Sequence, residues 1–133
     1  MKKRILIIDD DPSICESLCK VLRSEGYEAE SALHPHDFIK KFSARRPDLV
    51  LLDLNLPGLS GWDVFAALTS SDPFLPIVIV TGRQNQSQLA TDAGAGALME
   101  KPLNVPLLLG TIAHLIAQEP EVHLRRLSGL NRN

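Results

Sequence analysis

The chain has 133 residues and a formal net charge of −2, with 44% hydrophobic and 23% charged residues. This length fits one domain with a single buried core, and this composition excludes a disordered chain. The absence of a basic stripe argues against direct nucleic-acid binding. Apolar runs no longer than a strand exclude a membrane span and a signal peptide, so we expect a cytoplasmic location.

The first predicted strand is Arg4–Ile8, an isoleucine-rich run that stops at three successive aspartates. A helix should follow, with Asp11 as its N-cap and Pro12 in its first turn. Gly26 stands where a left-handed residue commonly ends a helix. Apolar residues at helical spacing predict a face packed on a sheet: Ile14, Cys15, Leu18, Val21 and Leu22.

Cys15 and Cys19 are the only cysteines, four residues apart on this predicted helix. No further Cys or His stands near them at metal-ligand spacing, so a zinc site is not expected. We interpret both cysteines as small apolar core residues of a protein in a reducing compartment.

The middle of the chain is predicted to hold two strands and two helices. A short polar strand at 27–31 suits a sheet edge, and a longer apolar strand ends at Asp53. A helix at 36–44 should bury Phe38, Ile39 and Phe42. Another helix should start at Ser60 or Gly61, with three residues facing inward: Val64, Phe65 and Leu68.

The last part of the chain is predicted to hold two strands and two helices. Residues 76–80 form a continuous apolar strand before Thr81, and 97–99 form a brief strand before Lys101. A short polar helix is expected at 83–92. The final helix should run from near Val105 to about residue 118 and face four residues inward: Leu108, Ile112, Leu115 and Ile116. We divide the chain into a domain, 1–118, and a C-terminal tail or linker stub, 119–133.

Strands and helices alternate along the whole domain, and three strands are apolar on both faces. A strand without a polar face needs helices on both sides of the sheet, and parallel strands joined by helices meet this need. Right-handed crossovers limit the topology to a few doubly wound forms. The predicted fold class is α/β with a doubly wound parallel sheet.

Polar side chains follow four of the predicted strands: Asp9 and Asp10, Asp53, Thr81, and Lys101. Because parallel strands end at one edge of a sheet, these groups can converge. Clustered carboxylates repel one another unless a cation lies among them, and Mg²⁺ suits such a site. An aspartate can accept a phosphoryl group that a lysine and a hydroxyl stabilise. For each residue alone, loop capping or a surface ion pair is the alternative, and Asp53 could cap the turn that follows it.

Four segments together resemble receiver domains of bacterial two-component response regulators: IDDDP (8–12), LLDLNLPGLSG (51–61), VTG (80–82) and EKP (100–102). The resemblance covers residues 4–118 in order and spacing. It implies a flavodoxin-like fold, a five-stranded parallel sheet of order 2-1-3-4-5 with helices on both faces. It also implies a cytoplasmic phosphoprotein of phosphorelay signal transduction, and not an enzyme.

Under this resemblance, Asp53 accepts a phosphoryl group from a histidine kinase or a phosphotransfer protein and becomes an aspartyl phosphate. Lys101 then pairs with one phosphoryl oxygen, and Thr81 moves to hydrogen-bond another. Pro102 is implied to follow a cis peptide bond. A loop and a helix face convert this local charge change into a new binding surface.

The resemblance also implies a Mg²⁺ cofactor. Asp10 and Asp53 would bind the ion directly together with the backbone carbonyl of Asn55, and Asp9 would act through a metal-bound water. Asn55 and Arg83 occupy flanking positions that tune the lifetime of the phosphoryl group in the family.

Two features depart from the family pattern. An aromatic residue usually stands three positions before the lysine, where this chain has Leu98, a residue suited to the core. The stretch between Thr81 and Lys101 is also shorter than usual. It falls on the face near residues 83–118, which we expect to bind a downstream protein or a second copy. Trp62 is expected as a half-buried aromatic residue at a helix start.

Three functions stay open at this point. The first is a phosphorylated receiver. A Mg²⁺-dependent phosphohydrolase with Asp53 as nucleophile would need a second carboxylate soon afterwards, where the chain has Asn55. The main alternative is a phosphorylation-independent interaction module, which Leu98 favours and the intact acidic residues oppose.

Overall fold

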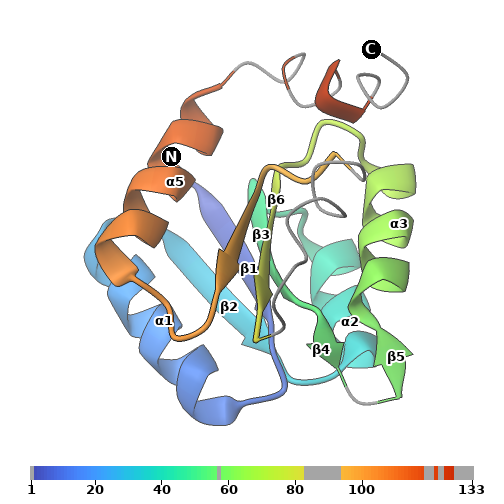
Figure 1. Cartoon of the computed structure of the whole chain (residues 1–133), viewed down its shortest axis with the longest axis horizontal. Coiled ribbons are helices and arrows are strands. Elements are labelled where there is room, and N and C mark those ends of the chain that lie inside the picture. Colours follow the sequence, from blue (N-terminus) through green and yellow to red (C-terminus); the bar gives the residue numbers. More distant parts are fainter. Residues whose placement is uncertain (1, 57, 83–93, 119–121, 123–124, 128–133) are drawn as a thin grey trace.

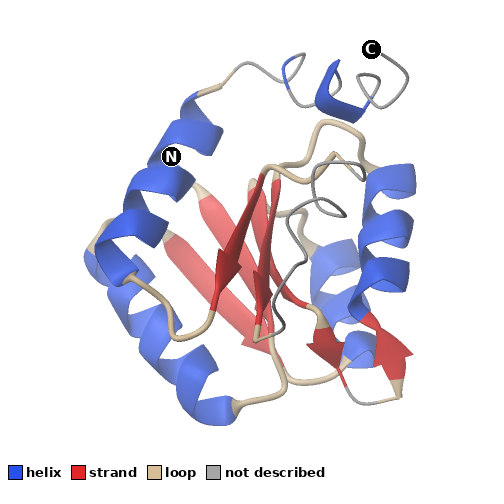
Figure 2. Ribbon diagram, viewed as in Figure 1, coloured by secondary structure: helices blue, strands red, loops and turns tan. Residues whose placement is uncertain are grey.

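The computed structural model describes residues 2–56, 58–82, 94–118, 122 and 125–127. These residues form three layers, with a parallel sheet between two pairs of helices (Figure 1 and Figure 2). Helices α1 (Pro12–Ser24) and α5 (Val105–Ala117) cover one face, and α2 (Pro35–Ala44) and α3 (Gly61–Ser71) cover the other. The predicted α/β class is confirmed. No helix in the described ranges is both long and apolar enough to cross a membrane.

The central sheet has five parallel strands in the order β2-β1-β3-β6-β7. These strands are β1 (Arg4–Ile8), β2 (Glu28–Ala32), β3 (Leu49–Asp53), β6 (Ile77–Thr81) and β7 (Ala97–Glu100). A separate antiparallel pair is formed by β4 (Asn55–Leu56) and β5 (Leu59–Ser60). The main sheet has the topology expected as 2-1-3-4-5, so that prediction is confirmed. The small β4–β5 hairpin is an addition that the sequence does not predict.

The three inner strands have no solvent-facing side, because every residue of β1, β3 and β6 is buried. Alternate residues enter the two cores: Leu6 belongs to the same core cluster as Phe38 of α2, and Ile7 to the same cluster as Leu108 of α5. A slip of one residue would exchange the two cores, so the packing fixes the register of each strand. It thereby fixes the position of each strand's carboxyl end.

Local signals set the ends of the helices, as predicted. The Asp11 side chain accepts hydrogen bonds from the backbone N–H groups of Ser13 at 2.9 Å and Ile14 at 3.4 Å. Gly26 follows α1 with a φ of 92°, a left-handed conformation that favours glycine. Ser60 caps α3 by accepting the N–H of Trp62 at 3.2 Å.

Helix α2 differs from its prediction at Ile39. The spacing predicts this side chain on the buried face, but it is 60% exposed. Phe38 and Phe42 are the buried residues of the helix, and their rings stack with centroids 6.0 Å apart. Ile39 is rotated by about 100° from Phe38 around the helix axis, so seating the two phenylalanines turns Ile39 to the rim.

Helix α1 buries a slightly different set from the predicted one. Cys15 and Cys19 are both buried and unpaired, as expected for apolar core residues. Ile14 and Val21, both expected inward, are only half-buried. The helix predicted at 83–92 lies outside the described residues, as does most of 119–133.

Gly61 opens α3 where its backbone passes close to the end of β3. A Cβ atom at Gly61 would lie 2.5 Å from the Cα of Leu54 and 3.0 Å from the carbonyl oxygen of Asp53. The Gly61 N–H also donates a hydrogen bond to the Leu54 carbonyl at 3.3 Å. No side chain fits there, so this contact brings α3 directly against the residue that follows the strand.

We expect Gly61→Ala to lower the free energy of unfolding by about 1–3 kcal/mol, because the added methyl group forces the backbone apart. Gly110→Ala is the matched control, since a Cβ at Gly110 in α5 meets no atom within 4 Å. That change should leave stability unchanged or raise it by up to about 1 kcal/mol. Urea denaturation measures both, and equal stability of the two variants would contradict the close contact.

Candidate functional site

The polar residues predicted at the strand ends meet at one edge of the sheet. Asp9 directly follows β1, Asp53 ends β3, Thr81 ends β6, and Lys101 directly follows β7. The backbone joins the last two, because the N–H of Lys101 donates to the carbonyl of Thr81 at 2.8 Å. Parallel pairing therefore places the predicted groups together, as expected from the topology.

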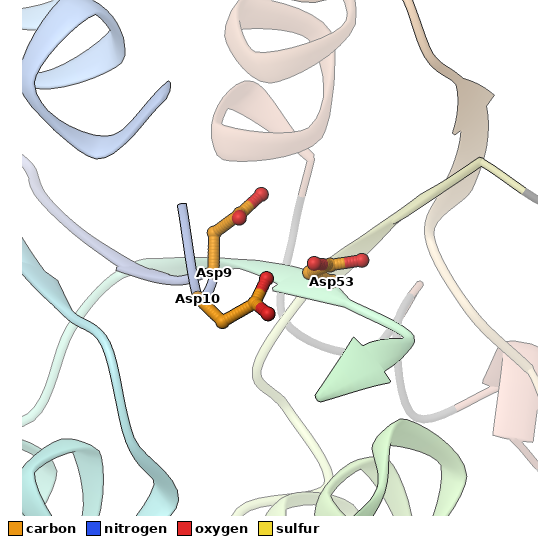
Figure 3. Close-up of side chains that lie close together, drawn as sticks. All are labelled: Asp9, Asp10 and Asp53. Atoms are coloured by element: carbon orange, nitrogen blue, oxygen red, sulfur yellow. The ribbon is translucent and has the colours of Figure 1, made fainter. Parts of the chain in front are cut away.

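Three carboxylates form the centre of this site. Asp9, Asp10 and Asp53 each offer an oxygen, and these oxygens all lie within 4.8 Å of one another. Asp9 and Asp10 come from the start of the β1–α1 loop, and the Asp10 carboxylate is directed toward Asp53 (Figure 3). Asp9 and Asp53 are buried, whereas Asp10 is exposed. The acidic cluster is thus closed on the protein side and open to solvent at Asp10.

Asp53 uses its two oxygens differently. Oδ1 accepts the backbone N–H of Asn55 at 3.0 Å, which caps the turn after β3. Oδ2 lies 3.4 Å from Nζ of Lys101. The turn-capping alternative considered from the sequence is therefore present at one oxygen, and it coexists with a second oxygen that faces the site.

Burial raises the pKa of the Asp53 carboxyl above its usual range. The hydrogen bond from Asn55 and the charge of Lys101 lower this pKa, and Asp9 raises it, but burial dominates. The side chain is only 1% exposed, so water does little to stabilise its charge. Ionising Asp53 in the folded protein therefore costs free energy, and a bound cation would lower this cost.

Lys101 is shared between two carboxylates. Its Nζ lies 3.0 Å from Oδ2 of Asp9 and 3.4 Å from Oδ2 of Asp53. Burial by itself lowers the pKa of Lys101, but the hydrogen bond and charge of Asp9, together with Asp53, outweigh it and raise that pKa. Lys101 stays charged and holds the ends of β1, β3 and β7 together.

Asp9 is anchored on three sides. Its Oδ1 accepts the N–H of Asp11 at 2.9 Å, and its Oδ2 pairs with Lys101. Its backbone carbonyl accepts a hydrogen bond from Sγ of Cys15 at 3.3 Å. The sequence gives no sign of this thiol contact, because Cys15 is equally well explained as an apolar residue of α1.

The donor set fits a divalent cation. Among the described residues, three carboxylates face one ammonium group, so an excess of negative charge remains at this part of the cluster. Oxygen ligands with one solvent-facing side suit Mg²⁺, which keeps several waters when bound. Asp9, Asp10 and Asp53 could therefore hold this ion, as the sequence predicts.

The residues around the site agree with several expectations. Lys101 and Pro102 are joined by a cis peptide bond. Leu98 is half-buried and packs against the core that contains α2 and α3, as expected for a core residue. Trp62 is half-buried and meets Phe65 edge to face, with ring centroids 5.7 Å apart. Asn55 is half-buried beside Asp53, and Arg83 lies outside the described residues.

Comparison with known proteins gives a family match over most of the chain. Residues 5–113 match the family described as the response regulator receiver domain. The DNA-binding response regulator MtrA of Mycolicibacterium smegmatis is 38% identical over 124 residues. The response regulator MprA of Mycolicibacterium vanbaalenii is 36% identical over 118 residues. These alignments cover 91% and 87% of this chain but 54% and 51% of the relatives, so the chain spans about half their length.

Two of the matching solved structures share the fold along nearly their whole length. The CheY-like receiver domain protein from Methanospirillum hungatei has 33% identity and a TM-score of 0.83, with 92% of this chain and 98% of that one covered. The response regulator TrrA from Thermotoga maritima, solved in complex with Mg²⁺-BeF, has 32% identity and a TM-score of 0.78. That match covers 86% of this chain and 99% of TrrA.

We expect Asp53→Asn to melt at a higher temperature than the native protein, by about 2–6 °C at neutral pH without divalent cations. Because burial raises the pKa of Asp53, the folded protein holds this proton more tightly than the unfolded chain does. The bound proton on Asp53 makes its full contribution to the free energy of unfolding at pH values below the ordinary carboxyl pKa. This contribution is lost as the pH rises through the raised pKa of Asp53 in the folded protein. The difference in melting temperature between Asp53→Asn and the native protein should therefore vanish in acid.

Thermal melts at neutral and acidic pH measure this effect. Asp10→Asn is the control, because Asp10 is exposed and its removal should raise the melting temperature less. A lower melting temperature for Asp53→Asn at neutral pH would show that the Lys101 pair outweighs the cost of burying the charge.

Proposed function

Because the chain belongs to the family of response regulator receiver domains, we propose that it accepts a phosphoryl group on Asp53 and thereby switches a partner-binding face. The observation that carries the proposal is the buried Asp53 carboxylate within the acidic cluster, with Oδ2 3.4 Å from Lys101. The protein then acts as a phosphoacceptor switch of a two-component system and not as an enzyme with a separate substrate.

The phosphoryl donor in this proposal is a phosphohistidine of a histidine kinase or a phosphotransfer protein. One carboxylate oxygen of Asp53 forms a bond to phosphorus as the P–N bond breaks. The electron pair of the P–N bond stays on the imidazole nitrogen of the donor. The product is an aspartyl phosphate at the carboxyl end of β3.

We assign the Mg²⁺ ligands to Asp10, Asp53 and the backbone carbonyl of Asn55, with Asp9 acting through a metal-bound water. Mg²⁺ bound at this place would supply positive charge for the oxygens of the transferring phosphoryl group. The support is the cluster of three carboxylates, whose excess negative charge one lysine does not balance. Asp9 differs from Asp10 in being buried and already paired with Lys101, which fits a less direct role.

Lys101 and Thr81 stabilise the phosphoryl group in this scheme. Nζ of Lys101 already reaches both Asp9 and Asp53, so a modest movement lets it pair with a phosphoryl oxygen. The Thr81 hydroxyl is assigned to a second phosphoryl oxygen. The hydrogen bond between the backbones of Thr81 and Lys101 couples the movement of the two residues.

The kinase or phosphotransfer protein has a suitable docking place beside the site. An apolar pocket of about 320 Å³ extends from Lys101 and lies between α1 and the start of α5. Its walls include Ile14 and Leu18 from α1 and Leu103 and Val105 from the other side. An apolar side chain of the partner placed there would bring its phosphohistidine to the exposed side of the acidic cluster.

The downstream partner, or a second copy of the chain, is proposed to bind the face near residues 83–118. Within the described part of that face, Leu107 of α5 is 58% exposed and so available to a partner. The DNA-binding activity in the description of MtrA belongs to a relative about twice as long. Direct nucleic-acid contact by this chain is not part of the proposal, nor is a membrane contact.

We expect the native protein to gain the mass of one phosphoryl group when incubated with Mg²⁺ and acetyl phosphate, and a chelator should abolish the gain. Intact mass spectrometry measures this adduct. Asp53→Asn should gain no mass, because its amide is not a nucleophile for phosphorus. Asp37→Asn is the control and should label like the native protein, because Asp37 lies on α2 and pairs with Lys41 there.

A native protein that stays unlabelled while correctly folded would remove the phosphorylation proposal. The remaining candidate would then be the interaction module that keeps the fold without the chemistry. Labelling of Asp53→Asn at the native rate would instead place the acceptor at another residue.

We expect Lys101→Met to slow phosphorylation by about 100-fold, comparable to the loss of one charge-stabilising donor in other active sites. The charge of Lys101 lowers the pKa of Asp53, so the substitution should raise that pKa further. The pH profile of labelling should therefore shift to higher pH, because less Asp53 is ionised at a given pH. Lys40→Met, an exposed residue of α2, should change neither the rate nor the profile.

A further inference from the structure

After α5 the chain returns and contacts the segment before β7 at Gly94. A Cβ atom at Gly94 would lie 2.8 Å from Cδ2 of Leu127, 3.1 Å from Cα of Leu127 and 3.3 Å from the carbonyl oxygen of Arg126. Gly94 is buried and has a φ of 82°. Two backbones therefore touch at this point with no side chain of residue 94 between them, and Leu127 occupies the place where one would be.

A second contact seats the same segment. Nη2 of Arg126 donates a hydrogen bond to Oε1 of Gln118 at 2.9 Å, just beyond the end of α5. Arg126 and Leu127 are both half-buried, and burial lowers the pKa of the Arg126 guanidinium. Residues 125–127, which we call the C-terminal latch, are thus held at two separate points.

The latch lies at the end of the sheet opposite the acidic cluster. In Figure 1 its short red helical turn stands beyond the end of α5, at the opposite side of the sheet from the β4–β5 hairpin. Its seat belongs to the segment that leads into β7, and two residues later the N–H of Gly96 donates to the carbonyl of Ile77 at 2.9 Å. Ile77 begins β6, so the seat is tied to the starts of the two strands that lead to Thr81 and Lys101.

Gly96 leaves little room for adjustment in this region. A Cβ atom there would lie 3.1 Å from Cδ1 of Leu115 in α5 and 3.2 Å from the carbonyl of Ile77. The segment 94–96 is therefore enclosed by Leu127 on one side and by α5 and β6 on the other. Closely packed contacts of this kind respond to small shifts by changing arrangement, because they have no space to deform gradually.

We propose that the C-terminal latch closes on Gly94 in the resting protein and that phosphorylation of Asp53 loosens it. This proposal rests on the function proposed above. Drawing Lys101 toward a phosphoryl group shifts the edge strand β7 slightly along its length. β7 has four residues and pairs only with β6 in the described sheet, so its far end follows this movement. The latch, fitted to the resting position of Gly94, then loses its contact.

The coupling has a reciprocal consequence. If the phosphorylated state disfavours the closed latch, a closed latch must disfavour the phosphorylated state by the same factor. The latch would thus set a threshold for activation and would also release residues 125–127 as a signal. A contact that only stabilises the fold would neither set a threshold for activation nor release residues 125–127.

Tryptic cleavage after Arg125 and Arg126 measures whether the latch is closed, because trypsin needs the arginine side chain and an extended backbone. In the native 133-residue chain, single cuts at these bonds should be slow. We expect Leu127→Ala to accelerate them about fivefold, as the loss of a half-buried apolar contact suggests. Ile39→Ala removes the same number of carbon atoms from an exposed position on α2 and should leave the rate unchanged.

The second arm adds Mg²⁺ and beryllofluoride, a mimic of the phosphoryl group, and follows the same cuts. We expect cleavage of the native protein to accelerate severalfold and that of Asp53→Asn to stay slow. Binding of beryllofluoride, read by fluorine NMR, should be severalfold tighter in Leu127→Ala than in Ile39→Ala. If the latch is only a structural contact, Leu127→Ala should still be cleaved faster, but its affinity for beryllofluoride should equal that of the control variant.

The outcomes separate the two proposals. Native protein that binds beryllofluoride without any change in cleavage overturns the coupling and leaves the phosphoacceptor function standing. Equal cleavage of Leu127→Ala and native protein in the resting state overturns the latch itself. Absence of beryllofluoride binding in the native protein overturns the phosphoacceptor function and the coupling with it.

Discussion

The site depends on placing a carboxylate at the end of a strand that has no solvent-facing side. Asp53 ends β3, and the two cores on either side of that strand exclude water from all five of its residues. The cost of this burial is offset in part by Lys101, which pairs with Asp53 and with Asp9. The fold therefore holds an aspartate in an environment where added positive charge is strongly favoured.

Much of this arrangement could be predicted, because it follows from local signals. Strands such as Arg4–Ile8 are continuous apolar runs, and a strand buried on both sides requires a parallel sheet between helices. Parallel strands end at one edge, so Asp9, Asp53 and Lys101 had to meet there. The helix ends could also be predicted, because an N-cap such as Asp11 accepts hydrogen bonds from residues only two and three positions away.

The remainder depends on contacts between distant parts of the chain. Ile39 fits the apolar spacing of α2, yet it is exposed because two phenylalanines fill the available contact. The close approach of Gly61 to Leu54, and the seat of Leu127 on Gly94, arise from packing that no local spacing encodes. For Leu98, packing against the core could be predicted from the sequence, whereas any part in signal transmission could not.

The two buried thiols of α1 make the protein a convenient host for spectroscopic labels. Cys15 and Cys19 are both in the core, and burial raises the pKa of Cys15, whose Sγ is already engaged with the carbonyl of Asp9. Since the thiolate is the reactive form, Cys15 should not compete for maleimide dyes in the native state, and Cys19 is shielded from them by its burial. A single cysteine introduced on an exposed helix face could thus be labelled selectively with both native cysteines left in place.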